Sequence, residues 1–287
     1  MASLFVDALT VIDFSYLDAQ RGIVGESWIV DVELEGDLND EGMVFDFGHV
    51  KKAIKAEIDS GMDHRFVVPE HMPGLLIQRG TEDSALSLKQ GHQGFSFNYR
   101  APNEAFYWLD ATTITLTDAT RHITAQVRKV VPANVKQVIV HLRTEENHGA
   151  FYHYSHGLKK HQGDCQRMIH GHRSNIRIDR AGSRDSFAEK TWAARWQDIY
   201  LITREDIQGE RTLFDVACYH VAYTAQQGRF ELTLPKERCY ILDTDTTVEL
   251  IAEHIAQEQA KVDPTCAWKV RAYEGVDKGA IATYTPA

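Results

Sequence analysis

The feature of this sequence that most restricts its fold is an approximate internal repeat of about 145 residues. Residues 24–36, which begin Val-Gly-Glu, and residues 170–182, which begin His-Gly-His, each alternate like a strand and end at a glycine twelve residues on. Residues 138–145 and 268–274 resemble each other as well, since each is a strand-like run that ends in glutamate. The repeat therefore predicts two copies of one structural unit.

Helical segments separate these strand-like runs. Residues 47–58 and 247–259 carry apolar side chains at helical spacing with charged residues opposite, and an Asp/Thr-rich stretch suited to capping precedes the second. We therefore predict an α+β fold made of two tandem units, 1–149 and 150–287, each an antiparallel sheet with helices on one face. The boundary lacks a Pro/Gly/Ser linker, which indicates tight docking of the two units.

Composition excludes several classes of protein. The 287 residues are 43% hydrophobic, and the apolar runs are far shorter than the roughly 20 residues that span a bilayer. A formal charge of −10 disfavours general nucleic-acid binding. The four cysteines form no CxxC pair, so the sequence suggests neither a disulfide framework nor a structural zinc finger. We expect a soluble cytoplasmic protein without a nucleic-acid or membrane partner.

The His170-Gly171-His172 motif is the strongest candidate for a functional site. Residues i and i+2 of a strand face the same side, so both imidazoles can converge on one point. His156, at the end of the YHYSH segment, can supply a third nitrogen from a neighbouring strand. Three protein ligands leave the fourth position of Zn²⁺ open, as in catalytic sites. The simpler alternative is a group of exposed histidines without a metal.

Two further features are candidates for proton transfer. Cys165 lies five residues before His170, and nearby positive charge can lower the pKa of a thiol and make it a base. Asp63-His64 is the only Asp-His dipeptide of the chain, and a carboxylate can orient an imidazole as a proton relay. A buried, inert cysteine and a helix-end histidine are the alternatives.

Carboxylates and cations near these motifs are candidates for substrate binding. Glu274, at the end of the last predicted strand, can accept two hydrogen bonds from an amino group and a ring N–H. Thr247 and Glu249 begin the late helix, where capping is the alternative role. Between residues 159 and 184 stand seven Lys/Arg against two acids, either a solvated face or a pocket for a phosphorylated anion.

Together these residues resemble the 6-pyruvoyl tetrahydropterin synthase family and the related bacterial 6-carboxytetrahydropterin synthases of queuosine biosynthesis. The matching segments are Tyr152–His156, Cys165, His170–His172, Gly42–Phe47, Met62–His64, Thr246–Ala252 and Glu274. Thr246 and Leu250 depart from the family's proline and asparagine, and Gly275 stands where threonine is common. The resemblance is weak over 66–115 and 183–240, which we interpret as insertions.

The matches divide between the two copies. In the first copy the metal positions are interpreted as Asp18, Val24 and Glu26, so we expect no zinc there. In the second copy no Asp-His pair follows the His-Gly-His strand. The resemblance implies T-fold units whose active sites lie between neighbouring units, so one complete composite site can form from both copies. Whether it forms within or between chains stays open.

The resemblance also implies a function. The chain would be a zinc-dependent lyase that converts 7,8-dihydroneopterin triphosphate to 6-carboxy-5,6,7,8-tetrahydropterin, with Zn²⁺ on the three histidines. Cys165 would abstract a proton, Asp63 and His64 would relay protons, and Glu274, with Thr247 and Glu249 nearby, would bind the pterin. A 6-pyruvoyl tetrahydropterin synthase, a non-catalytic pterin-binding protein and an epimerase or aldolase are the alternatives. We expect a homo-oligomer, such as three chains giving six units.

Overall fold

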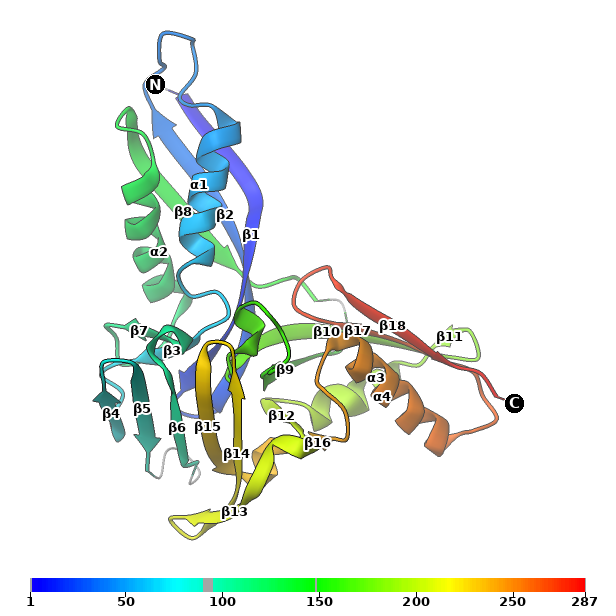
Figure 1. Ribbon diagram of the computed structural model, residues 1–287. Helices are drawn as coiled ribbons and strands as arrows, with labels where there is room; N and C mark the ends of the chain where they lie inside the picture. Colours follow the sequence, from blue (N-terminus) through cyan, green and yellow to red (C-terminus); the bar gives the residue numbers. More distant parts are fainter. Residues whose placement is uncertain (1, 90–94, 148, 287) are drawn as a thin grey trace.

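The computed structural model describes residues 2–89, 95–147 and 149–286. In the N-terminal half, residues 2–147, a five-stranded sheet has the strand order β7-β3-β1-β2-β8. Its elements are β1 (Ala2–Asp18), β2 (Gly22–Gly36), α1 (Phe47–Asp59), β3 (Phe66–Pro69), β7 (Phe106–Leu109), α2 (Leu116–Val130) and β8 (Val135–Arg143). Apolar side chains of both helices pack with those of β1 and β2 in one core, so the helices lie on one face of the sheet (Figure 1).

The C-terminal half, residues 149–286, contains the main strands β16-β12-β9-β10-β17-β18 in that order, and β11 pairs with β10. Its elements are β9 (Phe151–His156), β10 (His170–Arg180), β11 (Ser183–Arg184), α3 (Ser186–Arg195), β12 (Ile199–Thr203), β16 (Cys239–Leu242), α4 (Val248–Val262), β17 (Trp268–Tyr273) and β18 (Gly279–Tyr284). Trp192 and Ile255 of the two helices pack against strand residues such as Ile178 in a separate core.

The two halves share one topology. The order β7-β3-β1-β2-β8 corresponds element by element to β16-β12-β9-β10-β17, and α1 and α2 correspond to α3 and α4. Strand β18 has no counterpart among the described residues of the first half. This agreement supports the internal duplication inferred from the repeat.

The α+β prediction is confirmed, with one refinement of the sheets. Strands β1, β2 and β8 are antiparallel, as predicted, but β3 pairs parallel to β1 and β7 pairs parallel to β3. The C-terminal half repeats this at β12 and β16. The reason is that helical and inserted crossovers return the chain in its original direction. The sheets are therefore mixed rather than wholly antiparallel.

The weakly matching regions contain an equivalent insertion in each half. The first insertion forms β4 (Leu75–Arg79), β5 (Asp83–Leu88) and β6 (Phe97–Pro102), and the second forms β13 (Ile207–Leu213), β14 (Val216–Ala225) and β15 (Gly228–Pro235). They join through β15 and β6 into one six-stranded sheet, at the bottom of Figure 1.

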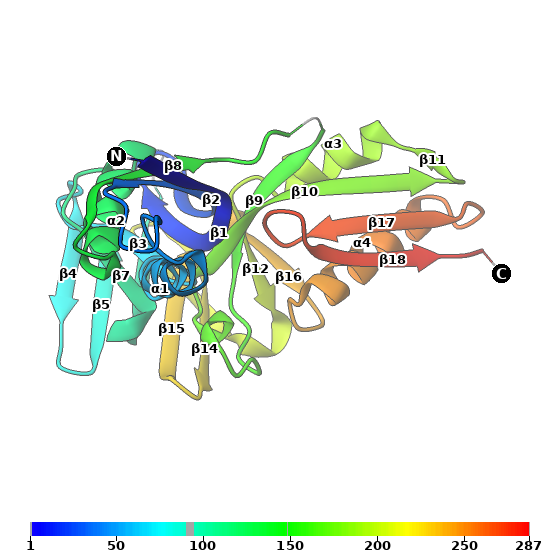
Figure 2. The same cartoon turned by 90° about the horizontal axis from the view of Figure 1, so that it is seen from above.

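The two halves meet where β1 and β2 pass β9 and β10, near the middle of Figure 2. Ser15 Oγ and Ser155 Oγ are 2.7 Å apart and buried at this seam. Gly25 and Gly171 permit the close approach, since a Cβ on either would overlap the backbone of the opposite half. The middle glycine of the His-Gly-His motif is therefore a packing requirement.

The chain passes from the first half to the second between Arg143 and Phe151, and we keep 1–149 and 150–287 as the proposed unit limits. Both predicted helices are present: α1 starts at Phe47, and α4 follows the cap residue Thr247, whose side chain accepts from Leu250 N. Within the described residues, no helix has the length and apolar character needed to cross a membrane.

Candidate metal centre and adjacent proton-transfer groups

Three buried histidines converge at the start of β10. His156 ends β9 directly opposite His170, and His172 lies two residues further along the same face of β10. One ring nitrogen from each comes within 4.8 Å of the others. The Nε2 atoms of His156 and His172 are 3.3 Å apart. The predicted convergence of these imidazoles is therefore present within one chain, and the cluster could hold a metal ion.

The partners of the rings leave the Nε2 atoms of His156 and His170 free to bind a cation. His156 Nδ1 lies 3.0 Å from the carbonyl of Thr246, and His170 Nδ1 lies 2.9 Å from that of Arg167. Because a carbonyl only accepts, each Nδ1 must carry the proton, and each Nε2 keeps its lone pair. His170 Nε2 is buried and has no hydrogen-bond partner in the described chain.

Electrostatics favour the neutral rings that a metal requires. Burial and the neighbouring imidazoles lower the pKa of both His156 and His170 well below the usual value. Two nitrogens bound to one tetrahedral zinc at about 2.0–2.1 Å lie about 3.3 Å apart, and the His156–His172 separation matches this. The nitrogen donors, their protonation and the orphaned Nε2 therefore fit a divalent transition metal.

The Asp-His pair of the N-terminal half lies beside this cluster. His64 and His170 have ring centroids 5.5 Å apart, and His64 Nδ1 is 2.7 Å from Asp63 Oδ2. Burial lowers the pKa of His64, but Asp63 and the sulfur of Cys165 outweigh it and raise the pKa to about 10. Cys165 is half-buried on a short 3-10 turn, Asp164–Gln166. Groups from both halves thus meet in one chain.

The three predicted substrate-binding residues lie at different distances from the cluster. Glu274 Oε1 is 3.9 Å from His172 Nε2, with its side chain 23% exposed. Thr247 caps α4, next to Thr246, whose carbonyl contacts His156. Glu249 is exposed on the first turn of α4. A pterin-binding role for these residues stays a prediction, which Glu274 fits best by position.

Each cation of the basic stretch between residues 159 and 184 already has a partner. Carboxylates pair with six of the cations, and Arg173 donates to the carbonyl of Glu145. The six pairs are Lys159–Asp206, Lys160–Asp245, Arg167–Asp164, Arg177–Asp179, Arg180–Asp263 and Arg184–Glu189. These partners favour the interpretation of a mainly structural set of charges.

The register corrects one of the assigned metal positions in the first half. Val24 corresponds to His170, and the residue paired with Val24 is Tyr16, just as His156 pairs with His170. Asp18, which the sequence comparison assigned, instead pairs with Gly22 at the hairpin end. Equal spacing from the aromatic residue hid this two-residue shift, because only strand pairing fixes which residues face each other. The equivalent trio is therefore Tyr16, Val24 and Glu26.

Sequence reasoning missed Asp13, which contacts the cluster, Lys278, which pairs with Asp13, and the contact that Thr246 makes with His156. Asp13 Oδ1 lies 3.2 Å from His172 Nδ1, Lys278 Nζ lies 3.0 Å from Asp13 Oδ2, and Thr246 contacts His156. Burial raises the pKa of Asp13, but His172 and Lys278 together lower it below its usual range. The available signal was an acid inside an apolar strand, between Ile12 and Phe14, since buried charges need partners.

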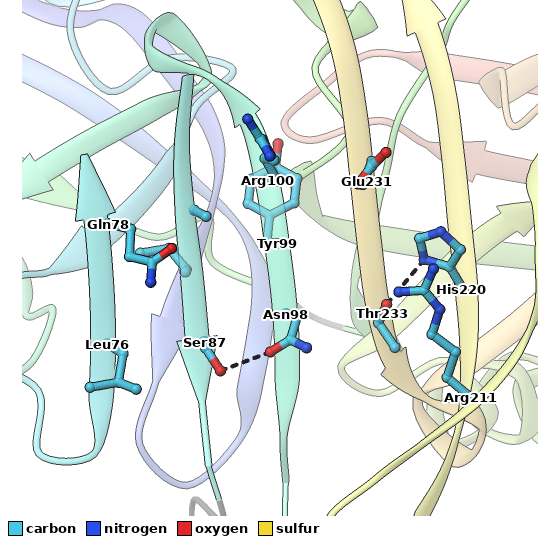
Figure 3. Close-up of a pocket in the computed structure, with 12 residues that line it drawn as sticks. Leu76, Gln78, Ser87, Asn98, Tyr99, Arg100, Arg211, His220, Glu231 and Thr233 are labelled. Atoms are coloured by element: carbon cyan, nitrogen blue, oxygen red, sulfur yellow. Dashed lines mark hydrogen bonds between the residues drawn. The ribbon is translucent and has the colours of Figure 1, made fainter. Parts of the chain in front are cut away.

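A separate cavity of about 310 Å³ lies on the six-stranded insertion sheet (Figure 3). Both insertions line it, with Ser87 and Asn98 from one and His220 and Thr233 from the other. Apolar residues of the same strands pack together with Met168 and Ile169, which precede the His-Gly-His motif. The insertions therefore pack against the segment that leads into the histidine cluster. The cavity is separate from the cluster, because none of the three histidines lines it.

Comparison with known proteins identifies the family. The model described as 6-pyruvoyl tetrahydropterin synthase matches residues 13–155. A putative 6-carboxy-5,6,7,8-tetrahydropterin synthase of Pyrococcus horikoshii is 37% identical over 62 residues, 22% of this chain and 36% of that protein. Its namesake from Pyrococcus abyssi is 34% identical over 64 residues, 22% of this chain and 38% of that protein. The chain thus spans little more than a third of the length of these relatives.

A solved structure of 6-pyruvoyl tetrahydropterin synthase from Plasmodium vivax covers 50% of this chain and 97% of its own, with 17% identity and a TM-score of 0.38. The family match extends from β1 through the N-terminal half and into β9. It thus contains Asp63 and His64, while His170 and His172 lie beyond it in the repeated half. The chain belongs to the 6-pyruvoyl tetrahydropterin synthase family.

Proposed function

We propose that this chain is a zinc-dependent lyase that converts 7,8-dihydroneopterin triphosphate to 6-carboxy-5,6,7,8-tetrahydropterin, the reaction used in queuosine biosynthesis. The observation that carries the proposal is the meeting of three buried imidazoles with Asp63, His64 and Cys165 at one seam. The names of the two Pyrococcus relatives support the carboxy product over the pyruvoyl one.

His156, His170 and His172 would hold the zinc through their Nε2 atoms. Bound zinc would supply Lewis acidity, which polarises the side-chain oxygens of the substrate and makes their protons more acidic. The fourth position of the metal would remain open to these oxygens. The neutral state that burial favours for His156 and His170 is the state that binds a cation.

The proton-transfer roles are assigned to groups beside the metal ligands. Cys165 would remove a carbon-bound proton next to the pterin ring, where its sulfur lies beside His64. With a pKa raised to about 10, His64 carries a proton at neutral pH and would deliver it as a general acid, oriented by Asp63. Glu274 would accept hydrogen bonds from the amino edge of the pterin.

The decisive assay incubates the purified, zinc-loaded protein with 7,8-dihydroneopterin triphosphate and identifies the products. Release of acetaldehyde with the 6-carboxy product supports the proposal. A pyruvoyl product without acetaldehyde supports 6-pyruvoyl tetrahydropterin synthase activity instead. Absence of turnover with any dihydropterin would eliminate both lyase activities.

A non-catalytic pterin-binding protein is the second candidate, and metal analysis separates it from the enzyme. Zinc near one per chain that disappears in His170→Ala favours the enzyme. Protein that binds a pterin but takes up no zinc favours the binding protein. We also propose a homo-oligomer, for instance three chains with six units, and the measured mass in solution tests this.

A further inference from the structure

We propose that Asp13 is a positioning residue for the metal site, so that the half of the chain without metal ligands sets how tightly the other half binds the cation. The inference rests on the proposed function only in requiring a metal at the three histidines. It concerns the one ligand, His172, whose Nδ1 is not held by a backbone carbonyl.

The contact between Asp13 and His172 crosses the seam and is almost completely buried. Asp13 is 2% exposed and His172 is 1% exposed. Asp13 Oδ1 lies 3.2 Å from His172 Nδ1, within ion-pair distance, although the two are not aligned as a hydrogen bond. Among the described residues His172 Nδ1 has no hydrogen-bond partner, so this carboxylate is the group placed to become one.

The other two ligands show what is required of the third. In His156 and His170 a carbonyl holds the proton on Nδ1 and leaves Nε2 for the cation. A carboxylate that accepts from Nδ1 of His172 would do the same for this ring and would also increase the basicity of its Nε2. Loss of such an outer partner typically weakens metal binding by about 10–100-fold.

The surroundings hold Asp13 in place. Ser27 Oγ donates to Asp13 Oδ1 at 2.5 Å, and Lys278 Nζ lies 3.0 Å from Oδ2. Gly275, with φ of 72°, makes room for the carboxylate, because a Cβ at this position would overlap Asp13 Oδ1. The departure from the family's threonine at Gly275 therefore accompanies the buried acid.

The side chain of Asp13 faces His172, and its backbone holds the Asp63–His64 pair. Its N–H donates to Asp63 Oδ1 at 2.9 Å, and its carbonyl accepts from His64 N at 2.7 Å. One residue of β1 thus connects the Asp-His pair to the histidine cluster. Movement of the first half along the seam would displace the Asp13 carboxylate and the Asp63–His64 pair together.

The test compares Asp13→Asn with the wild-type full chain. An amide has one oxygen, so it cannot accept both from Ser27 and His172 at the Oδ1 position and from Lys278 at the Oδ2 position. We therefore expect the Zn²⁺ dissociation constant to rise about 10–100-fold. Competition with a chromogenic chelator measures it. The matched control is Ser15→Ala, which removes a buried hydrogen bond across the same seam. Its dissociation constant should stay within about twofold of the wild type while its stability falls.

Nitrogen NMR of the His172 ring gives a readout that a purely structural role would not change. We expect Nδ1–H and a metal-bound Nε2 in the wild-type protein, and a population with the proton on Nε2 in metal-free Asp13→Asn. An unchanged zinc affinity in folded Asp13→Asn would overturn the inference. If that variant does not fold, coordination of zinc through Nδ1 of His172 in the wild type would overturn it instead.

The same measurements separate this inference from the proposed function. A wild-type protein that binds zinc but turns over no dihydropterin contradicts the proposed activity, while a weakened Asp13→Asn still supports the positioning role. Turnover by the wild type with unaltered zinc affinity in Asp13→Asn contradicts only the positioning role. A wild-type protein that binds no zinc eliminates both.

Discussion

The histidine cluster and the equivalent place in the first half differ in what holds them together. At the cluster, three imidazoles of the second half face His64 of the first half. At the equivalent place, Tyr16, Val24 and Glu26 replace the imidazoles, and Asp198 replaces His64. His64 and Asp198 both have a positive φ. Each lies two residues before a strand residue that pairs at the seam, Phe66 with Ser15 and Tyr200 with Ser155.

At this equivalent place, called the second place below, an ion pair is found instead of potential metal ligands. Arg21 donates through Nε to Asp198 Oδ2 at 2.9 Å, which joins the two halves. Arg21 also donates to the hydroxyl of Tyr16. The histidine cluster thus presents nitrogen donors that could bind a cation. At the second place the guanidinium of Arg21 is itself the cation, and it links the two halves.

The largest expected effect is the loss of metal from His170→Ala. Two remaining imidazoles cannot replace a three-ligand site, so zinc should fall from about one per chain to a trace. Elemental analysis of dialysed protein measures this. The control is His161→Ala, an exposed histidine on the loop that follows β9. Retention of a full zinc equivalent in His170→Ala would disprove the assigned cluster.

Removal of His64 should reduce turnover while zinc remains bound. His64→Ala deletes a proposed general acid that is not a ligand, so we expect a loss of about 10²–10⁴-fold in kcat. Zinc content should equal that of the wild type.

The groups of the proposed site meet within one chain, so mixing His64→Ala chains with Cys165→Ala chains should restore no activity. Recovery in the mixture would show that the active site forms between chains. A control mixture of wild-type and His64→Ala chains gives the activity expected from simple dilution.

The first half's Glu26 should make stability fall as pH rises. Burial raises the pKa of Glu26 from its usual 4.5 to about 7. The folded state then binds more protons than the unfolded state between these values, so the Glu26 contribution to the free energy of unfolding decreases by roughly 3 kcal/mol across this window. Urea unfolding at pH 5 and pH 8 measures it. Glu26→Gln should reduce the decrease, and an identical pH dependence would contradict the assignment.

The smallest expected effect concerns the ion pair at the second place. Arg21→Ala leaves Asp198, whose side chain is 8% exposed, without its guanidinium. The partial exposure of Arg21 moderates the cost to about 2 kcal/mol in the free energy of unfolding. The double variant Arg21→Ala/Asp198→Ala should recover part of it. Zinc affinity should remain unchanged, since a decrease would mean that this place also supports the metal.

Much of the site was predictable because its parts are local in sequence. The spacing of His170 and His172 on one strand, and the position of His156 at the end of the preceding strand, follow from strand periodicity. Thr247 as a helix cap follows from its place before an amphipathic segment. The pairing of Tyr16 with Val24 was missed, since hairpin register depends on the turn and on tertiary packing.

The sequence by itself determined the repeat, the α+β class and the residue types of the candidate site, because periodicity and motif spacing act over a few residues. Only the tertiary structure decided that His64 and Cys165 meet the histidines within one chain, that the two insertions share a sheet, and that Asp13 reaches His172. The physical reason is that these contacts join residues about a hundred or more positions apart, and the packing of Gly25 against Gly171 at the seam brings them together.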